Sequence, residues 1–278
     1  MSSKFITAGV IGWPVSHSRS PIIHNHWVHQ YGLAGCYGLF PVAPGNLEKA
    51  LQGIRALGIA GCNITIPYKI EAMKFMDWID PLAERIGAIN TVVVQANGEL
   101  HGFNTDGFGY VQSLRDANPQ WRADLGPVVI VGAGGAARSI IVSMINEGAR
   151  DIRIINRTMS KAQDLAEEFG NTVNAVDWAD RHNVLNDAAL LTNTTSQGMV
   201  NEPALDLNIR QLPKSALVSD VIYAPLETPL LTQAKKQGNT TVNGLGMLIH
   251  QARPAFHAWF GVMPDCTQEL NQKIINTF

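Results

Sequence analysis

Residues 128–138 read Val-Val-Ile-Val-Gly-Ala-Gly-Gly-Ala-Ala-Arg. The four apolar residues that open this stretch predict a short buried strand, and the apolar segment 136–147 that follows predicts a helix. Between them, Gly132-x-Gly134-x-x-Ala137 is the Gly-x-Gly-x-x-Ala form of the dinucleotide-binding turn. Gly132 permits the tight turn, Gly134 lets the main chain approach a pyrophosphate, and Ala137 is small enough for the helix to pack on the strand. The stretch therefore predicts a dinucleotide-binding α/β fold.

The strand that follows indicates which dinucleotide is bound. An NAD enzyme usually carries an acidic residue at the end of this strand, here 152–155, to bond the ribose 2′-hydroxyl. The chain has Asn156, Arg157 and Thr158 there instead, with Lys161 one helical turn further on. An arginine fork, a hydroxyl and a lysine suit a 2′-phosphate, so the sequence predicts NADP rather than NAD. A solvated basic helix start is the alternative. The phosphates would be held by main-chain amides of Gly132, Ala133, Gly134, Gly135 and Ala136.

Strand-like and helix-like segments alternate in the first hundred residues, and a second block of the same kind begins near Asn118. This alternation predicts an α/β fold with mainly parallel strands. Ser20 and Pro21 are expected at the N-cap and the first position of the first helix, and Asn97-Gly98 predicts a hairpin turn. The expected strands are Ala8–Ile11, Tyr37–Val42, Gly61–Ile66, Thr91–Gln95, Glu99–Gly102, Val128–Val131, Ile152–Ile155, Ala189–Thr192 and Leu217–Val221. The expected helices are Pro21–Tyr31, Leu47–Leu57, Ala136–Glu147, Lys161–Phe169, Gly246–Phe260 and Thr267–Phe278.

Length and composition narrow the class of protein. With 278 residues, 46% of them hydrophobic, the chain is long enough for two modest domains or one large domain. A net charge of −2 argues against a nucleic-acid partner. No segment has the 18 or more apolar residues of a membrane span, and 5–12 is expected to be a buried strand rather than a signal peptide. Cys36, Cys62 and Cys266 are scattered, and the eight histidines lack ligand spacing. We therefore expect reduced thiols, no metal site and a cytoplasmic location.

Several loops carry residues suited to chemistry. Ser18 and Ser20 precede the first helix, whose N-terminus is a natural place for a carboxylate. Segment 63–69, Asn-Ile-Thr-Ile-Pro-Tyr-Lys, ends in Lys69, and segment 104–106, Asn-Thr-Asp, ends in Asp106. A lysine that donates to a carbonyl oxygen, oriented by an aspartate, is what carbonyl–alcohol redox chemistry at a nicotinamide needs.

Taken in order, these motifs resemble the shikimate dehydrogenase family, and the resemblance covers essentially the whole chain. It is carried by His-Ser-x-Ser-Pro (17–21), Asn-Ile-Thr-Ile-Pro-Tyr-Lys (63–69), Gly-Ala-Ile-Asn-Thr (87–91), Asn-Thr-Asp-Gly (104–107), Gly-Ala-Gly-Gly-Ala-Ala-Arg (132–138), Asn-Arg-Thr (156–158), Asp-Val-Ile-Tyr (220–223) and Gly-Leu-Gly-Met-Leu-Ile-His-Gln (244–251).

The resemblance implies NADP-dependent, reversible reduction of 3-dehydroshikimate to shikimate on the route to chorismate and the aromatic amino acids. It implies Lys69 and Asp106 as the catalytic pair. It implies substrate contacts from Ser18, Ser20, Thr65, Asn90, Tyr223 and Gln251, and nicotinamide contacts from Val221, Gly244 and Met247. It further implies a substrate-binding domain of residues 1–105 and 246–278, a Rossmann-like NADP-binding domain of residues 106–245, and an active site in the cleft between them.

Three alternatives stay open on the sequence. A quinate/shikimate or aminoshikimate dehydrogenase would share most of these motifs, and two serines do not exclude quinate. A non-catalytic NADP-binding regulator would be expected to lack Lys69 or Asp106, and both are present. Each residue taken singly also has a purely structural interpretation. Lys69 could simply start a helix, Asp106 and Ser20 could simply cap one, and Gln251 could be a hydrogen-bonded amide of the core. The sequence allows a monomer or a homodimer.

Overall fold

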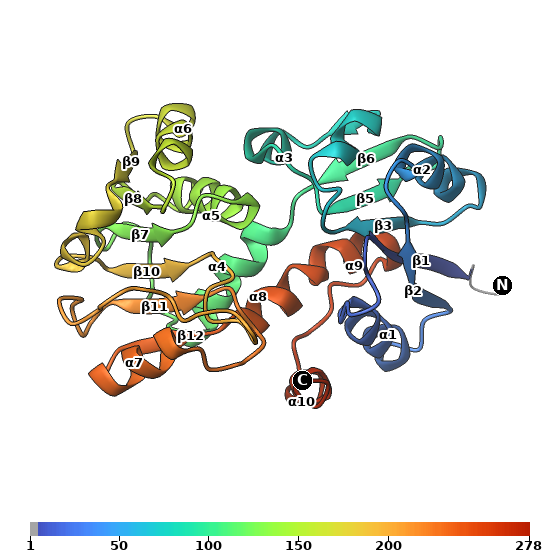
Figure 1. The fold of residues 1–278 in the computed structure, drawn as a ribbon. Coiled ribbons are helices and arrows are strands. Elements are labelled where there is room, and N and C mark those ends of the chain that lie inside the picture. Colours follow the sequence, from blue (N-terminus) through green and yellow to red (C-terminus); the bar gives the residue numbers. More distant parts are fainter. Residues whose placement is uncertain (1–4) are drawn as a thin grey trace. The chain divides into compact units, whose positions relative to one another are not determined.

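The computed structural model describes residues 5–278, which form two compact units (Figure 1). The first unit runs up to Thr105 and resumes from Gln251 to Phe278, and the second is Asp106–His250. The chain therefore passes from one unit to the other directly before Asp106 and returns directly before Gln251. Each unit has its own six-stranded sheet with helices around it. The predicted α/β class is confirmed.

The first unit holds a mixed sheet in the order β2-β1-β3-β5-β6-β4. β1 is parallel to both β2 and β3, whereas β3, β5 and β6 run antiparallel in turn. The hairpin predicted at Asn97-Gly98 joins β5 to β6, and Gly98 has the left-handed φ of +87° that such a turn favours. The strands are β1 (Ile6–Gly12), β2 (Gly35–Pro41), β3 (Gly61–Ile64), β4 (Trp78–Ile79), β5 (Thr91–Val94) and β6 (Leu100–Phe103). The helices are α1 (Ser20–Gln30), α2 (Leu47–Ala56), α3 (Pro81–Ile86), α9 (Ala252–Phe260) and α10 (Gln268–Ile275), with a 3-10 turn η1 at Glu71–Phe75.

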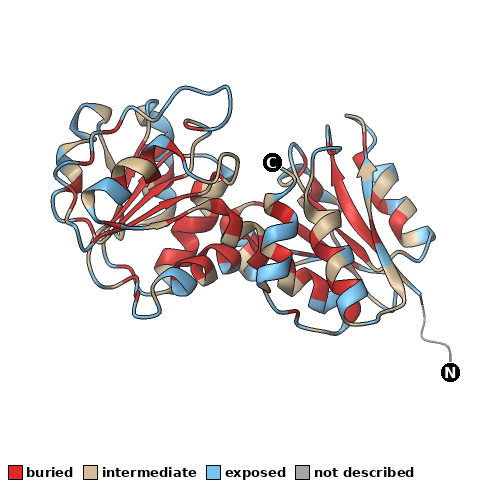
Figure 2. Cartoon of the chain, turned by 90° about the horizontal axis from the view of Figure 1, so that it is seen from below, coloured by how far each residue is buried: buried red, intermediate tan, exposed pale blue. Residues whose placement is uncertain are grey.

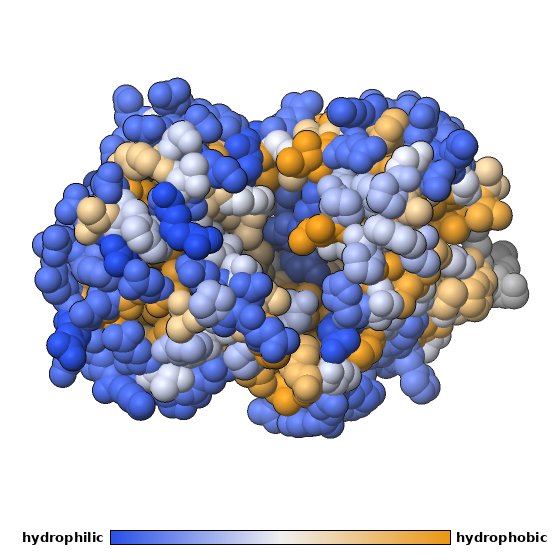
Figure 3. Space-filling view, in the orientation of Figure 1, coloured by the Kyte–Doolittle hydropathy of each residue, from blue (hydrophilic) through white to orange (hydrophobic). Residues whose placement is uncertain are grey.

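Both faces of this first sheet are covered. Ile11 of β1 belongs to a buried cluster with Leu47 and Leu51 of α2. Trp27 of α1 and Phe256 of α9 are fully buried and lie edge to face, with ring centroids 5.4 Å apart. In Figure 2 the central strands of both units appear largely in the colour of buried residues, with exposed residues on the helices and loops around them. Hydrophilic residues cover most of the face seen in Figure 3.

The second unit holds an all-parallel sheet in the order β12-β11-β10-β7-β8-β9. This is the doubly wound order, which reverses between the first strand of the unit, β7, and its neighbour β10. The Rossmann-like prediction is therefore confirmed. The strands are β7 (Val128–Val131), β8 (Ile152–Ile155), β9 (Val173–Val176), β10 (Leu190–Asn193), β11 (Leu217–Asp220) and β12 (Thr240–Val242). The helices are α4 (Asp106–Ala117), α5 (Gly135–Asn146), α6 (Met159–Phe169), α7 (Pro229–Gln237) and α8 (Gly244–His250), with 3-10 turns η2 at Trp178–Asp180 and η3 at Asn183–Leu185.

Alternate residues of β7 serve two separate cores. Val128 and Ile130 join the buried cluster that includes α4 and α5, whereas Val129 and Val131 join the cluster that includes α7. A strand that is buried on both faces explains why the fold-deciding stretch is continuously apolar. In the described part of the chain, no helix is long and apolar enough to cross a membrane.

Two predictions about helices are wrong. Ser20 is not the N-cap of α1: the helix already includes Ser20, Arg19 is the cap residue with helical φ and ψ, and the cap makes no side-chain hydrogen bond. The predicted helix Gly246–Phe260 is two helices, α8 and α9, with Gln251 between them. Pro254 has no N–H for the carbonyl of His250, four residues earlier, so a single continuous ladder of hydrogen bonds cannot run through this point.

Candidate active site

The loops that follow β1 and β3 are tied together at one edge of the first sheet. Because the two strands are parallel neighbours, their carboxyl ends lie side by side. Thr65 N–H donates to the Ile11 carbonyl at 2.9 Å, and Trp13 N–H donates to the Ile66 carbonyl at 3.1 Å. A Cβ on Gly12 would lie 2.4 Å from Thr65 Cγ2, so glycine is needed for this close approach. The edge thus brings the loop of Ser18 and Ser20 next to the loop of Thr65 and Lys69.

Asn90 is the centre of a buried polar group in the first unit. Its side chain is 2% exposed, and its Nδ2 donates to Thr105 Oγ1 at 3.0 Å and to Gln251 Oε1 at 3.3 Å. Its Oδ1 accepts from Thr105 N–H at 3.0 Å and from Thr91 Oγ1 at 2.9 Å. The Thr105 hydroxyl donates to the Gln251 carbonyl at 2.7 Å. Asn90 and Gln251, 161 residues apart, are therefore neighbours. Thr105 belongs with them although the sequence reasoning did not select it; its place inside the Asn-Thr-Asp motif was the available signal.

Lys69 is half-buried, and its main chain is linked to the segment that carries Asn90. The Ile89 N–H donates to the Lys69 carbonyl at 2.9 Å, and the Ile64 N–H donates to the Asn90 carbonyl at 2.8 Å. These two bonds fix where the lysine loop lies relative to Asn90. The first unit thus brings Ser18, Ser20, Thr65, Lys69, Asn90 and Gln251 onto loops and helix ends around one set of strands.

Asp106 is the first residue of α4 in the second unit, and it is 9% exposed. The next residue, Gly107, packs tightly on α5: a Cβ at this position would lie 1.9 Å from Ser143 Oγ. The first turn of α4 is therefore held against the helix that starts at the glycine turn.

The glycine turn has the shape that a pyrophosphate requires. Gly132 has φ of +112°, which favours glycine, and a Cβ there would lie 2.5 Å from Thr194 Oγ1. Backbone conformation and lack of space therefore both require glycine at this position. A Cβ on Gly134 or Gly135 would meet no atom of the described chain within 4 Å. Gly134 is the N-cap of α5 and offers no side chain to the first-turn amides. The turn thus combines room beside the main chain with uncapped amide donors, as a bound phosphate group needs.

The residues after β8 suit a second phosphate. Asn156 Nδ2 donates to the Thr158 carbonyl at 2.8 Å, which shapes the turn. Arg157 and Lys161 are exposed, and neither forms an ion pair within residues 5–278. Arg153 on the same strand differs, because it pairs with Asp151 and Asp187. The exposed charge of this turn is therefore cationic, and it is available to bind an anion.

Val221, Gly244 and Met247 lie close together at the carboxyl ends of β11 and β12. A Cβ on Gly244 would lie 2.0 Å from the Val221 carbonyl oxygen, and Gly244 N–H donates to the Ile222 carbonyl at 2.9 Å. Val221, Met247 and Ala133 of the glycine turn all pack against the same buried cluster. Tyr223 follows two residues after Val221 and is half-buried.

Asp220 is a further buried residue at this edge. It is 1% exposed, and its carboxylate accepts from Asn193 Nδ2 at 3.1 Å, Thr228 Oγ1 at 2.8 Å and Ile222 N–H at 3.1 Å. Burial raises the pKa of Asp220 above its usual value, and the donated hydrogen bonds oppose this rise. Asp220 thus ties β10 and β11 to the start of the loop that carries Tyr223. Asp220 was not among the predicted site residues, although it opens the Asp-Val-Ile-Tyr motif (220–223).

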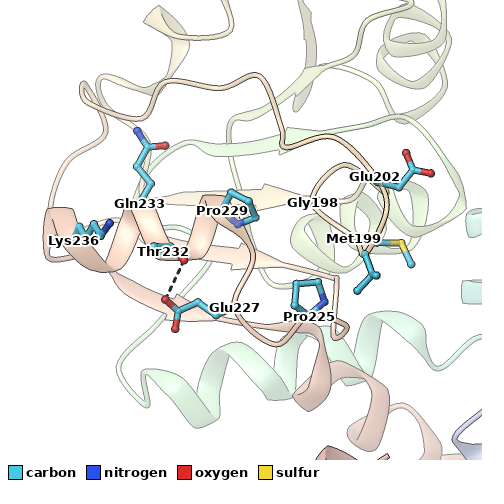
Figure 4. Close-up of a pocket in the computed structure, with 10 residues that line it drawn as sticks. Gly198, Met199, Glu202, Pro225, Glu227, Pro229, Thr232, Gln233 and Lys236 are labelled. Atoms are coloured by element: carbon cyan, nitrogen blue, oxygen red, sulfur yellow. Dashed lines mark hydrogen bonds between the residues drawn. The ribbon is translucent and has the colours of Figure 1, made fainter. Parts of the chain in front are cut away.

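A separate pocket of about 600 Å³ lies in the second unit, between loops 198–202 and 225–229 and helix α7 (Figure 4). Thr232 and Glu227, which line it, are joined by a hydrogen bond of 3.0 Å. None of the predicted site residues lines this pocket.

The chain is similar to known proteins over most of its length. Residues 10–92 match the profile described as shikimate dehydrogenase substrate binding domain, 121–220 match shikimate / quinate 5-dehydrogenase, and 244–269 match shikimate 5′-dehydrogenase C-terminal domain. The chain belongs to the shikimate dehydrogenase family. The resemblance seen in the sequence is thereby confirmed.

Relatives within the shikimate dehydrogenase family are similar over nearly the full chain. Shikimate dehydrogenase (NADP(+)) of Rhodospirillum rubrum is 48% identical, with 99% of each chain covered. Among solved structures, shikimate 5-dehydrogenase of Thermus thermophilus in complex with NADP(H) and shikimate has a TM-score of 0.87 and 34% identity, covering 98% of this chain and 100% of that one. Quinate dehydrogenase of Corynebacterium glutamicum in complex with NAD has a TM-score of 0.90 and 31% identity, with the same coverage.

Proposed function

We propose that the protein is an NADP-dependent shikimate dehydrogenase, which reversibly reduces 3-dehydroshikimate to shikimate on the route to chorismate and the aromatic amino acids. The observation that carries the proposal is the buried polar group around Asn90, next to the loop of Lys69. Shikimate is a small anion rich in hydroxyl groups, and a site of serine, threonine, asparagine and glutamine side chains can pair each of them. Such a site also discriminates strongly, because an analogue that lacks a hydroxyl leaves a buried polar group unpaired.

The two units take different parts in this proposal. The first unit binds the substrate: Ser18 and Ser20 hold the carboxylate, and Thr65, Asn90 and Gln251 bind the ring hydroxyls. The second unit binds NADP and adds Tyr223 beside the substrate. The assignment of the substrate to the first unit is supported by the match of residues 10–92 to the shikimate dehydrogenase substrate binding domain, and the assignment of NADP to the second unit is supported by its glycine turn.

The cofactor site is supported by the fit of this chain's own residues. The amides of Gly132, Ala133, Gly134, Gly135 and Ala136 would hold the pyrophosphate. Asn156, Arg157, Thr158 and Lys161 would hold the adenosine phosphate, and Val221, Gly244 and Met247 would lie by the nicotinamide. When bound, the reduced cofactor supplies the hydride.

Lys69 and Asp106 carry the proton chemistry in this proposal. Lys69 donates a proton to the carbonyl oxygen of 3-dehydroshikimate as that oxygen gains negative charge, and it takes the proton back in the direction of oxidation. Asp106 accepts a hydrogen bond from the same region of the substrate and keeps the ammonium group oriented. No metal ion is assigned to the reaction, since the lysine can polarise the carbonyl.

A quinate dehydrogenase activity is the main competing function. Quinate has one more hydroxyl, on the carbon that bears the carboxylate, so its recognition depends on the surroundings of Ser18 and Ser20. Arg157 favours NADP, whereas the quinate dehydrogenase with a similar fold was solved with NAD. Initial rates with shikimate and quinate, each with NADP⁺ and NAD⁺, separate the two. We expect shikimate with NADP⁺ to give the highest kcat/KM; a higher value for quinate with NAD⁺ would overturn the proposal.

Replacing Ser18 by alanine is expected to raise the KM of shikimate and leave NADP⁺ binding unchanged. A hydrogen bond to a charged group contributes about 1.5–3 kcal/mol, so the KM should rise roughly tenfold or more. Steady-state kinetics measure this change. Ser16→Ala is the matched control, since Ser16 is an exposed serine of the same loop. If the Ser18 variant keeps the wild-type KM, the serine only shapes the turn.

We also propose a cytoplasmic enzyme, present as a monomer or homodimer. Cys36, Cys62 and Cys266 are all free thiols, which fits a reducing compartment. Light scattering coupled to size-exclusion chromatography decides between monomer and homodimer.

A further inference from the structure

His24 and Asn25 come directly after the serine loop, and the proposed substrate site gives neither of them a role. Both residues contact Tyr37 of β2. Asn25 Nδ2 donates to the Tyr37 carbonyl at 2.9 Å, and Tyr37 N–H donates to Asn25 Oδ1 at 2.9 Å. Because β2 is the outer strand of its sheet, the Asn25 side chain takes the place that a neighbouring strand would occupy at this residue. The main chain of Tyr37 is thereby fixed.

The ring of Tyr37 is fixed as well. The His24 ring stacks on it, with centroids 4.1 Å apart and planes 3° from parallel, and the Trp259 ring lies 6.0 Å away. His24 is fully buried, and burial lowers its pKa to about 3, so the ring is neutral at physiological pH. Neither ring nitrogen meets hydrogen-bond geometry with a described residue, although Asn63 is close enough to oppose part of the pKa change. His24 therefore serves as a flat neutral surface that holds the phenol ring in one plane.

The Tyr37 phenol sets the direction of a chain of hydrogen bonds that ends at Asn90. The phenol is 3% exposed and donates to Asn63 Oδ1 at 2.7 Å. Asn63 must then present its NH₂ group to the other side, where it donates to Thr91 Oγ1 and to the Asn90 carbonyl, both at 3.1 Å. The Thr91 hydroxyl accepts this bond and donates to Asn90 Oδ1 at 2.9 Å. The Asn90 amide thus has its oxygen turned toward this chain, an orientation that the Thr105 N–H also favours because it donates to the same oxygen.

The Ser20 hydroxyl lies near the Tyr37 phenol, close enough to oppose part of the rise in the phenol's pKa that burial causes.

We infer that Tyr37, held by His24 and Asn25, is a positioning residue that orders Asn90 for the substrate through Asn63 and Thr91. This inference rests on the proposed function and adds a group that acts through its neighbours rather than by touching the substrate. A site whose side chains are already ordered loses less conformational entropy on binding, which strengthens binding without changing the chemistry. Without the phenol, Asn63 Oδ1 would lose its donor from Tyr37, and a flipped Asn63 amide would turn Oδ1 toward the Asn90 carbonyl oxygen, which cannot donate.

The test is Tyr37→Phe, which keeps the ring, its stacking on His24 and the main-chain contacts with Asn25. We expect the dissociation constant of shikimate, measured by titration calorimetry without cofactor, to rise on the order of tenfold. The KM of shikimate should rise in parallel, whereas kcat and the dissociation constant of NADP⁺ should stay within about threefold of wild type.

Tyr110→Phe is the matched control. The Tyr110 phenol is equally buried and hydrogen-bonds to Thr192 in the second unit. This variant should lose similar stability and keep wild-type shikimate binding. Unchanged shikimate binding in Tyr37→Phe, an equal loss in Tyr110→Phe, or a fall in kcat with constant KM would each overturn the positioning role. A wild-type protein that neither binds nor oxidises shikimate would instead overturn the proposed function itself, and this inference with it.

Discussion

Replacing Lys69 by alanine is expected to lower kcat by about two to four decades, the usual contribution of a positioned acid–base group. The KM of shikimate should change much less, because the loss is felt chiefly in the transition state, when the carbonyl oxygen gains charge. Lys69 lies four residues after Thr65, past the end of β3, and its carbonyl is fixed by Ile89 N–H at 2.9 Å. The loop is therefore held in place while the four-carbon side chain remains able to reach the reacting carbon.

Steady-state kinetics in both directions measure this effect. Lys74→Ala is the matched control, because Lys74 is an exposed lysine only five residues away on η1. It should leave kcat within about twofold of wild type, as removal of an exposed charge usually has small effects. The contrary result for Lys69→Ala is a raised KM with an unchanged kcat. In that case Lys69 binds the substrate, and the proton must travel through Asp106 or water.

The central strands and turns of the fold were predictable because their signals are local. Val128–Val131 is confirmed at both ends, since four apolar residues stand between Pro127 and the glycine turn. The Asn97-Gly98 hairpin is confirmed for the same reason. The outer strands β9 and β12 were missed. Val173–Val176 and Thr240–Val242 are short and partly exposed, so neither has the continuous apolar run that marks a strand buried on both faces.

The helix ends show where local signals compete. Ser20 followed by Pro21 is a good helix start by composition, yet the chain already adopts helical φ and ψ at Arg19. The apolar pattern across Gly246–Phe260 concealed a break at Gln251, where the chain returns to the first unit. Pro254 was the signal for that break, because its missing N–H interrupts the ladder four residues earlier.

Residues that act through other residues could not be found from the sequence alone. Tyr37 and Asn63 lie 26 residues apart, and their hydrogen bond exists only because β1 pairs with both β2 and β3. Asp220 reads as one acidic residue in an apolar strand, and only the fold shows three donors around its carboxylate. The resemblance to the family predicted the substrate and cofactor residues. The buried residues that support them, such as Tyr37 and Asp220, become neighbours only through the order of the strands in each sheet.

Arg157→Ala is expected to weaken NADP⁺ binding by about one to two decades and to leave NAD⁺ binding nearly unchanged. A charge-assisted, bidentate contact to a phosphate contributes about 1.5–3 kcal/mol. NAD has no 2′-phosphate, so its binding does not include this contact and should not weaken. The observation behind this expectation is that Arg157 is exposed at the end of β8 and forms no ion pair with any described residue. Its charge is therefore not needed to hold the fold, unlike that of Arg153, which pairs with Asp151 and Asp187.

Dissociation constants of both dinucleotides, measured by calorimetry as well as by kinetics, check the expectation without relying on turnover. Arg150→Ala removes a charge from an exposed arginine in the same unit and controls for the general electrostatic field. Because a contact between exposed charges is screened by salt, the difference between the Arg157 and Arg150 variants should shrink as ionic strength rises. If NADP⁺ affinity is unchanged in Arg157→Ala, Arg157 does not bind the 2′-phosphate. The preference for NADP would then have to come from the other proposed phosphate contacts, Asn156, Thr158 and Lys161.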